Sequence, residues 1–304
     1  MSVSATFLAF GLLSSKFFRL DTIGGIATIT AEIAVVSVPL ALLIMSGEFD
    51  LSVGSVYAFA GVLAAILLNL KLSEVAVLCA VLLFGGVAGL LNGLLTTKLR
   101  LPSFIVTLGM MFTLRGLLLV ITAGFPVSFK GNSYMLQVFN GKLWGEFRMS
   151  SIWLALITGL FYIVVNMTKH GNWSLACGGN VEVARALGVP VVRVKRINFF
   201  LTGLFAAFGG LLAFARFGMA YPTLAEGLEL ESIAAVVLGG CSLGGGYGTV
   251  WGALLGSILI ASLRVGLVLA GAPAYWYRAF IGLILIGGMI INKQTMRKIL
   301  GVEQ

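Results

Sequence analysis

Long, nearly uninterrupted runs of apolar residues are the feature that most limits what this chain can fold into. A helix needs about 20 mostly apolar residues to cross the hydrocarbon core of a bilayer. Segments of roughly this kind lie at 3–18, 25–46, 52–70, 74–96, 103–123, 151–167, 193–217, 230–243, 249–270 and 275–292. The segment 230–243 is too short to cross unaided. The pattern predicts an all-α bundle of about ten transmembrane helices, forming a single membrane domain over residues 1–304.

The low charge content excludes a water-soluble fold. Only 10% of the residues are charged and 59% are hydrophobic, whereas a soluble domain has about 25% charged residues with which to cover its surface. Membrane lipid must therefore solvate most of the chain. The net charge of +9 comes from scattered residues and forms no continuous basic patch, so a nucleic acid is not an expected partner.

The positions of Lys and Arg predict the orientation, because cytoplasmic loops carry an excess of these residues. Basic residues gather in the segments 97–102 and 168–196 and in the tail after residue 292. With ten spans and both termini in the cytoplasm, all three segments fall on the cytoplasmic side. The loop at 124–150 then lies outside, and the loop at 168–192 lies inside.

The stretch MSGEFDLSVGS at 45–55 interrupts two apolar runs with almost no polar loop between them. Non-helical backbone at membrane depth is tolerated only when it is buried in protein or lines a water-filled cavity, and an acidic residue there is a functional candidate. We therefore expect Glu48, Asp50, Ser52 and Ser55 to belong to the translocation pathway or its gate. An ordinary turn at the membrane surface is the alternative.

The glycines fall into two groups with different meanings. Many lie inside apolar runs, as in 84–95 and 205–215, and predict close helix packing. Others crowd the stretch 238–252, which resembles a phosphate-binding loop but lacks the lysine and the strand–helix context that such a loop requires. We expect a tight re-entrant or cytoplasmic turn there, and no nucleotide, cofactor or metal bound by this chain.

Polar residues elsewhere in the apolar runs carry no recognisable catalytic pattern. The three cysteines are far apart, and the lone His170 is expected to be a solvated interfacial residue. Four arginines lie within apolar runs, at positions 115, 216, 264 and 278. Long side chains near span ends can reach the interface, but Arg264 lies deeper and should face the bundle interior, water or a subunit interface.

The segment CGGNVEVARALGVPVVRVKR at 177–196 predicts a short polar helix in the cytoplasmic loop. Gly178 and Gly179 should form a turn with Asn180, which is a plausible N-cap for a helix beginning at Val181. Gly188 would end the helix and Pro190 would prevent its continuation. Such a helix is either a capped connector or a docking element for a soluble partner.

Three motifs in order resemble the membrane permeases of bacterial sugar-type ABC importers, which carry ribose, xylose, galactose and related solutes. They are DLSVGS at 50–55, GGNVEVARALGV at 178–189 and LELESIAAVVLGGCSLGGGYGTVWGALLGSILI at 228–260. The resemblance covers nearly the whole chain from residue 15. Departures at Glu48-Phe49, Cys241 and Arg264-Val265 weaken any assignment of the solute.

The resemblance implies a multi-pass inner-membrane permease that works as a homodimer or heterodimer. It implies a cytoplasmic ABC ATPase that binds ATP-Mg, and a periplasmic or extracellular solute-binding protein. The helix at 181–187 would be the coupling helix that docks on the ATPase, with Gly179, Asn180, Glu182, Ala184, Arg185 and Gly188 as its functional residues. The acidic outer loop at 218–231 becomes a candidate for docking the binding protein through Glu226, Glu229 and Glu231, although a solvated turn explains it equally well.

Three other functions remain open. A branched-chain amino-acid permease belongs to a neighbouring group, but DLSVGS matches the sugar group. A secondary transporter often has broken helices at equivalent points of two halves, and the breaks at 46–55 and 239–249 are not equivalent in a five-plus-five division. A membrane-embedded enzyme would need a catalytic constellation, and the sequence offers none.

Overall fold

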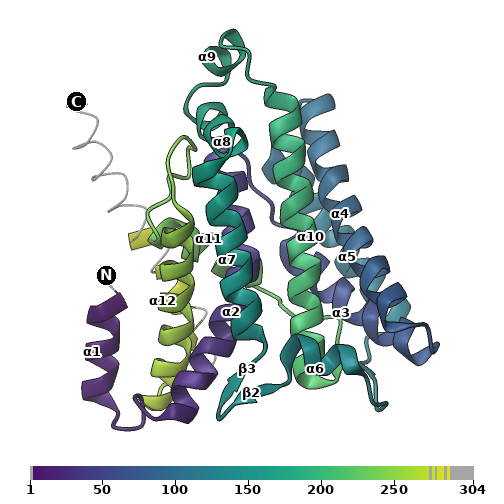
Figure 1. Cartoon of the computed structure of the whole chain (residues 1–304), viewed down its shortest axis with the longest axis vertical. Coiled ribbons are helices and arrows are strands. Elements are labelled where there is room, and N and C mark those ends of the chain that lie inside the picture. Colours follow the sequence, from purple (N-terminus) through teal and green to yellow (C-terminus); the bar gives the residue numbers. More distant parts are fainter. Residues whose placement is uncertain (1–2, 274–275, 278, 284–285, 288–304) are drawn as a thin grey trace.

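The computed structural model describes residues 3–273, 276–277, 279–283 and 286–287, which form mostly helices (Figure 1). The helices are α1 (Val3–Leu13), α2 (Leu20–Met45), α3 (Val53–Asn69), α4 (Glu74–Lys98), α5 (Ser103–Thr122), α6 (Tyr134–Asn140), α7 (Ser150–Met167), α8 (Lys169–Gly179), α9 (Val181–Ala186), α10 (Val191–Phe217), α11 (Leu228–Leu238) and α12 (Val250–Leu269). The short strands are β1 (Val127–Ser128), β2 (Lys142–Trp144), β3 (Phe147–Arg148) and β4 (Met219–Ala220).

Six of the described helices are long and apolar enough to cross a membrane, namely α2, α4, α5, α7, α10 and α12. This confirms the predicted helical membrane bundle. Helices also form in three other expected spans but are shorter, with 11 residues in α1, 17 in α3 and 11 in α11. Most of the expected last span, 275–292, and the basic tail lie outside the described residues.

Helix α2 runs through the centre of the bundle. Every residue from Ile33 to Met45 is buried, and 89% of the most apolar window of α2 is covered by protein, against 22% for α5. Helix α2 contacts α7, α10, α11 and α12, while α10 also packs against α3 and α4. The apolar side chains of α5 therefore lie mostly on the outer surface of this chain, and those of α2 pack inside it.

Helices α4 and α10 cross at backbone distance, as the glycine-rich runs predict. A side chain on Gly89 of α4 would overlap the carbonyl oxygen of Phe199, and one on Gly203 of α10 would overlap the carbonyl oxygen of Gly85. Small residues at such crossings let van der Waals contacts between backbones replace the hydrophobic drive that lipid removes.

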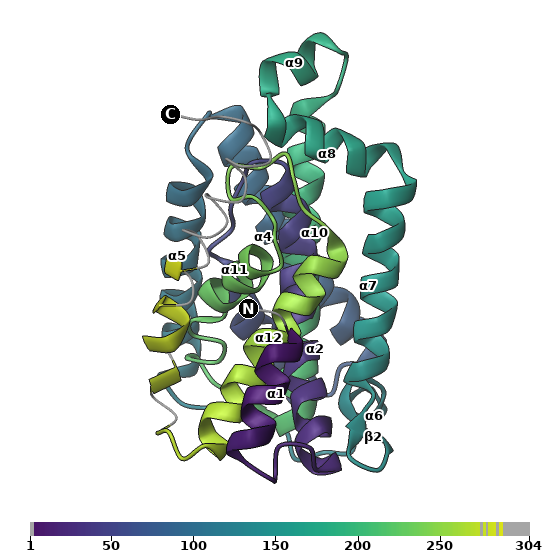
Figure 2. The same ribbon diagram turned by 90° about the vertical axis from the view of Figure 1, so that its left-hand side faces the viewer.

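The loops gather at two opposite ends of the molecule. Helix α9 stands beyond α8 at one end, while α6, β2 and β3 lie at the other, in both Figure 1 and Figure 2. The segments 97–102 and 168–196, which carry the basic residues, meet at the α9 end, where Arg196 Nε donates to Thr97 Oγ1 over 2.8 Å.

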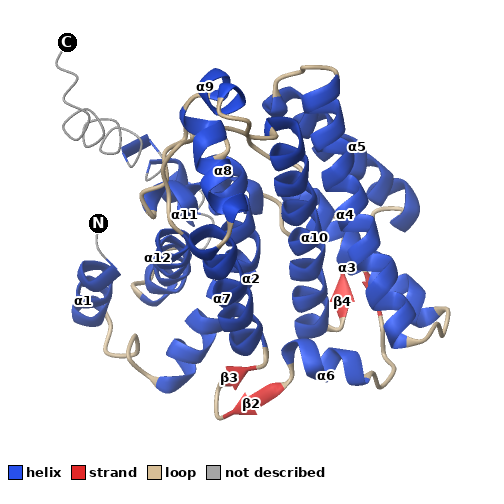
Figure 3. Cartoon of the chain, turned by 45° about the horizontal axis from the view of Figure 1, so that its top comes forward, coloured by secondary structure: helices blue, strands red, loops and turns tan. Residues whose placement is uncertain are grey.

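Neither of the two long loops is irregular throughout. The loop 124–150 contains α6 and the β2–β3 hairpin, and its strand β1 pairs with β4 at the end of α10 (Figure 3). The loop 168–192 contains both α8 and α9. The expected turn at Gly178 and Gly179 is wrong, because α8 continues through both glycines.

We predict that Gly203→Ala lowers the free energy of unfolding by roughly 1–3 kcal/mol, because the new methyl group would force the α4 and α10 backbones apart. Thermal unfolding of the purified protein in detergent measures this. The matched control is Gly159→Ala on the exposed face of α7, where an added methyl group meets nothing within 4 Å. Equal unfolding midpoints for the two variants would show that the crossing does not depend on glycine.

Candidate functional site

Helix α9 forms where the sequence predicts a short polar helix, and its two ends explain why. Asn180 is extended (φ −157°, ψ 111°), and its Oδ1 accepts hydrogen bonds from the backbone N–H groups of Glu182 and Val183, both at 3.0 Å. This satisfies two of the donors that a helix start leaves free. At the other end, Gly188 has φ +79°, a conformation that glycine adopts without strain.

Two side chains anchor α9, the buried Ala184 and the partly buried Val181, and the others are exposed. Ala184 is buried in a small apolar cluster with Cys177, Val191 and Val194. On the outer side, Val183 and Leu187 are 54% and 78% exposed, and Glu182 and Arg185 form an exposed ion pair at 3.3 Å. An ion pair this exposed adds little to stability. The helix therefore presents two apolar side chains and a charged pair at one end of the molecule.

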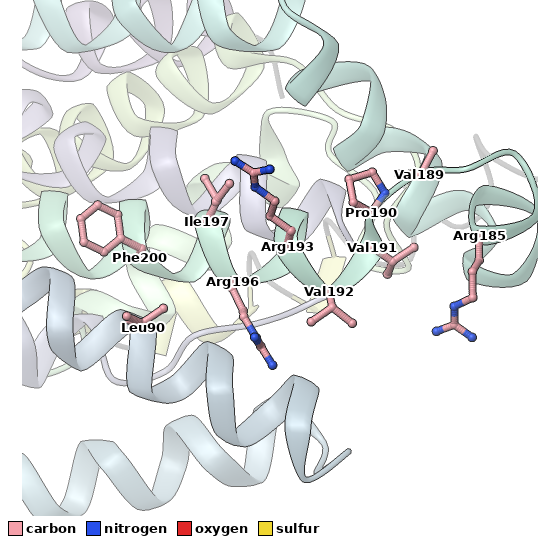
Figure 4. A pocket seen from close by; sticks show the side chains of 10 residues that line it. All are labelled: Leu90, Arg185, Val189, Pro190, Val191, Val192, Arg193, Arg196, Ile197 and Phe200. Carbon is pink, nitrogen blue, oxygen red and sulfur yellow. The ribbon is translucent and has the colours of Figure 1, made fainter.

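A groove of about 570 Å³ lies beside α9, bordered by α4, α10 and the link between α9 and α10. Figure 4 shows Arg185 at the α9 end of this groove, and Leu90 and Phe200 at the other end. Arg193 and Arg196 also border it. Its rim is basic and its floor is apolar.

Three glycine-containing segments meet directly behind α8, and we call this contact the glycine junction. The backbone N–H of Gly246 donates to the carbonyl oxygen of Met45 over 2.9 Å. A side chain on Gly178 would overlap both of these groups, and one on Gly245 would press against Gly178 and Gly47. The end of α2, the end of α8 and the turn between α11 and α12 are thus in backbone contact. This close approach explains the glycines at 178–179, which are helical and do not form a turn.

The break between α2 and α3 is buried and is held by a polar cluster. Asp50 Oδ1 accepts hydrogen bonds from the Ser52 backbone N–H (2.8 Å) and hydroxyl (2.6 Å). Asn92 of α4 donates to Ser52 Oγ over 2.9 Å and approaches both Asp50 oxygens at 3.3 and 3.4 Å. All three residues are at most 1% exposed. Ser55 lies one turn further along and donates to the carbonyl oxygen of Met111.

Glu48 does not belong to this cluster but ties the break to α10. Its carboxylate pairs with Lys195 Nζ at 2.5 Å, and both side chains are less than 15% exposed. Lys195 lies in the basic run that follows α9. A side chain in the break is therefore linked directly to the chain segment that carries α9 into α10.

The expectation that His170 is solvated is wrong. Its Nε2 lies 2.7 Å from Oδ1 of the buried Asn198 on α10. The amide nitrogen of Asn198 in turn donates to Ser174 Oγ (3.1 Å) and to the carbonyl oxygen of Leu42 (3.3 Å). Asn198 thereby joins α8, α10 and α2 just behind the glycine junction.

The three glutamates near the start of α11 do not share one surface. Glu226 is exposed, whereas Glu229 is half-buried against Gly54 and accepts a hydrogen bond from the Gly227 N–H at 3.2 Å. Glu231 lies on the wall of a cavity inside the bundle. Only one of the three is thus freely available at the surface.

Two of the arginines in the apolar runs, Arg115 and Arg216, have partners inside the protein that sequence reasoning missed. Arg115 donates to the carbonyl oxygens of Pro222 and Leu224. Arg216 donates to both carboxylate oxygens of Glu32 at 3.0 and 3.1 Å. Glu32 is the single charged residue in the run 25–46, and this was a signal for an interior polar site.

Of the two remaining arginines, only Arg264 lies among the residues that the structure describes. The Arg264 guanidinium lies 5.5 Å from the centre of the Tyr277 ring and borders the same cavity as Glu32. The residue as a whole is exposed on the single chain, so it faces both the cavity and the outer surface. Arg278 lies outside the described residues. Among the described residues, no group of three or more histidine, cysteine or acidic side chains could hold a metal ion.

Comparisons with known proteins agree on one kind of protein. A family model described as "Branched-chain amino acid transport system / permease component" matches residues 22–289. The ribose import permease protein of Escherichia coli (strain K12) is 33% identical over 93% of this chain and 88% of its own length. The autoinducer 2 import system permease protein of Yersinia pseudotuberculosis is 32% identical over 96% of this chain and 83% of its own.

A third relative, the ribose import permease protein of Bacillus subtilis (strain 168), is 33% identical over 83% of this chain and 78% of its own length. No solved structure matches the chain significantly. The family model and the relatives each cover most of the sequence. The chain therefore belongs to the family of ABC importer permeases that includes the ribose and autoinducer 2 import permeases.

Proposed function

We propose that this chain is the membrane permease of an ATP-driven importer for a monosaccharide-type solute, and that α9 is the helix through which a separate ATPase drives it. The observation that carries the proposal is α9 itself. It is capped at both ends, anchored by the buried Ala184 and the partly buried Val181, and exposes Glu182, Val183 and Arg185 at the basic end of the molecule. A connector without a partner has no need of exposed Val183 and Leu187.

Three contacts provide a route from α9 into the bundle. The glycine junction links α8 to α2 and to the turn after α11. The Lys195–Glu48 pair links the segment after α9 to the break before α3. Asn198 links α8, α10 and α2. A displacement of α9 would therefore act on the break and on α2 together. Alternating access requires two states of the bundle, and a partner shifts the equilibrium between them only if it binds one state more tightly than the other.

The proposed topology has ten spans with both termini in the cytoplasm, in a single membrane domain. Support comes from the meeting of the basic segments 97–102 and 168–196 at the α9 end, which the positive-inside rule assigns to the cytoplasm. The family is one of multi-pass inner-membrane proteins, and the six long apolar helices accord with that. The loop 124–150 and the start of α11 would then face the outside.

The proposed assembly contains a cytoplasmic ABC ATPase that binds ATP-Mg, a second permease chain of the same or a different sequence, and a solute-binding protein outside. Family membership supports the ATPase and the binding protein as partners. Of the three glutamates considered for docking the binding protein, Glu226 is the best placed because it is exposed. Asp50, Ser52, Ser55 and Glu48 are proposed to hold the gate and not to contact solute, because Asp50, Ser52 and Ser55 are buried against other helices and Glu48 is paired with Lys195.

A branched-chain amino-acid permease is the second candidate, because the matching family is described by that transport system. The ribose and autoinducer 2 permeases favour a small polyhydroxylated solute. Uptake by the assembled complex of labelled D-ribose, D-xylose, D-galactose and L-leucine separates the two candidates. Uptake of L-leucine alone would contradict the sugar assignment.

We predict that the double substitution Glu182→Ala and Arg185→Ala leaves membrane insertion intact but abolishes solute uptake and the ATPase activity that a loaded binding protein stimulates. The pair is exposed, so its loss should change stability by less than about 1 kcal/mol. The matched control is Arg19→Ala with Asp21→Ala, which removes another exposed ion pair, at 3.0 Å, at the start of α2. Normal uptake by the Glu182 and Arg185 variant would contradict the assignment of α9.

We predict that Asp50→Ala lowers the free energy of unfolding by about 1–3 kcal/mol, because it leaves the buried Ser52 N–H without its acceptor and removes the carboxylate that the Ser52 hydroxyl and the Asn92 amide also approach. The exchange Asp50→Asn with Asn92→Asp keeps one carboxylate and one amide in the cluster and should restore much of the loss. Thermal unfolding and uptake are measured for both. A double variant no better than Asp50→Ala would show that the cluster is not what holds the break.

A further inference from the structure

A polar cavity of about 350 Å³ lies within the bundle, away from both α9 and the break. Residues from α2, α3, α10, α11 and α12 form its walls, and the segment 221–226 forms its mouth. Its size is at the small end of the range of about 300–1,000 Å³ that is usual for small-molecule sites. None of the residues proposed for coupling or gating lines it.

The walls carry charges that oppose one another. The Glu32–Arg216 pair lies on one wall, joining α2 to α10, and its side chains keep 14% and 26% of their surface exposed. Glu231 of α11 and Arg264 of α12 supply a further carboxylate and guanidinium. With Glu226 at the mouth, the lining holds three carboxylates and two guanidiniums, so the charges largely cancel. They do provide many hydrogen-bond acceptors and donors.

Tyr57 of α3 adds a neutral polar group to the cavity. It is 3% exposed and lines the cavity wall, with its ring packed against Gly209 of α10. Among the described residues, no hydrogen bond is found to the Tyr57 hydroxyl. A phenolic hydroxyl can donate one hydrogen bond and accept others, so this one can bind a group that enters the cavity it lines.

The cavity opens at the end of the molecule opposite α9. Thr223 and Glu226, at its mouth, are exposed. They follow the C-terminal end of α10, whereas α9 precedes its N-terminal end. In the proposed topology this mouth faces the side on which a binding protein delivers solute.

We propose that this cavity is a transient binding site for a neutral, polyhydroxylated solute on its way through the permease, and that Tyr57 hydrogen-bonds a solute hydroxyl there. This assignment rests on the proposed function. A compact solute with many hydroxyl groups can use the paired carboxylates and guanidiniums as acceptors and donors without carrying charge itself. A branched-chain amino acid would place its apolar side chain against these charges, which costs desolvation without compensation.

The test is Tyr57→Phe in the assembled complex with ATPase and binding protein in proteoliposomes. The substitution removes one hydroxyl and keeps the ring that packs on Gly209. We expect the maximal uptake rate of whichever sugar is accepted, among D-ribose, D-xylose and D-galactose, to fall roughly threefold to tenfold. A decrease of this size corresponds to the loss of one hydrogen bond to a neutral ligand. ATPase stimulation by the loaded binding protein and the solute concentration for half-maximal uptake should stay unchanged, because the binding protein sets the latter.

Two comparisons make the result specific. Tyr162→Phe on α7, whose ring lies near Trp251, is the matched control and should leave uptake unchanged. A series of singly deoxygenated forms of the accepted sugar should contain one whose uptake Tyr57→Phe does not reduce, because that analogue lacks the hydroxyl that Tyr57 binds. Glu231→Gln, which alters one charge on the opposite wall, should likewise lower uptake while ATPase stimulation persists.

Unchanged uptake by Tyr57→Phe, or an equal loss for the sugar and all its deoxygenated forms, would overturn the site while leaving the importer assignment intact. The failure of the proposed function has a different signature. In that case the unmodified complex itself takes up none of the sugars and shows no stimulated ATPase activity, and the site falls with it.

Discussion

The structure depends on how the chain satisfies a non-helical backbone inside an apolar bundle. Between α2 and α3 the chain leaves the helical conformation, although almost no polar loop separates the two apolar runs there. Lipid offers no hydrogen-bond partners, so each unsatisfied backbone group there costs several kcal/mol. Asp50 accepts from the Ser52 backbone N–H, and the Ser103 hydroxyl accepts from the Phe49 backbone N–H, so the partners come from within the protein. That solution fixes where α3 begins, and thereby which side of α3 faces α4 and α5 and which faces the cavity.

The glycines at the α9 end also make the contact between α8, α2 and the α11–α12 turn rigid. Where backbones touch without side chains between them, as at Gly178, Met45 and Gly246, no flexible group can absorb a displacement. Closely packed contacts of this kind change between discrete arrangements and do not deform gradually. A force on α8 must therefore move the end of α2 or the turn before α12. A side chain at Gly178 or Gly246 would separate the backbones and abolish this rigid contact.

The sequence predicts local features well and long-range partners poorly. The caps of α9 could be read from Asn180 and Gly188, because capping depends on residues within one or two turns. The polar break could also be predicted, since it interrupts an apolar run. The Glu32–Arg216 pair could not, because the partners are separated by 184 positions in the chain. Gly178 and Gly179 show the same limit. Two adjacent glycines favour a turn. In the structure both are helical, and because they lack side chains they let α8 come into backbone contact with α2 and with the α11–α12 turn.

The first turns of α3 connect the two polar regions of the bundle. Ser55 faces α5 through its bond to Met111, while Gly54 packs against Ala225 and Glu229 beside the mouth of the cavity. The segment before α3 is bound through Glu48 to Lys195, next to α9. A movement that starts at α9 and displaces Glu48 would therefore shift α3 relative to α10, and with it Tyr57 relative to Arg216. Because α3 forms part of the cavity wall, this shift would change the affinity of the cavity for a polar solute. Coupling between two sites requires such a difference in affinity between two states.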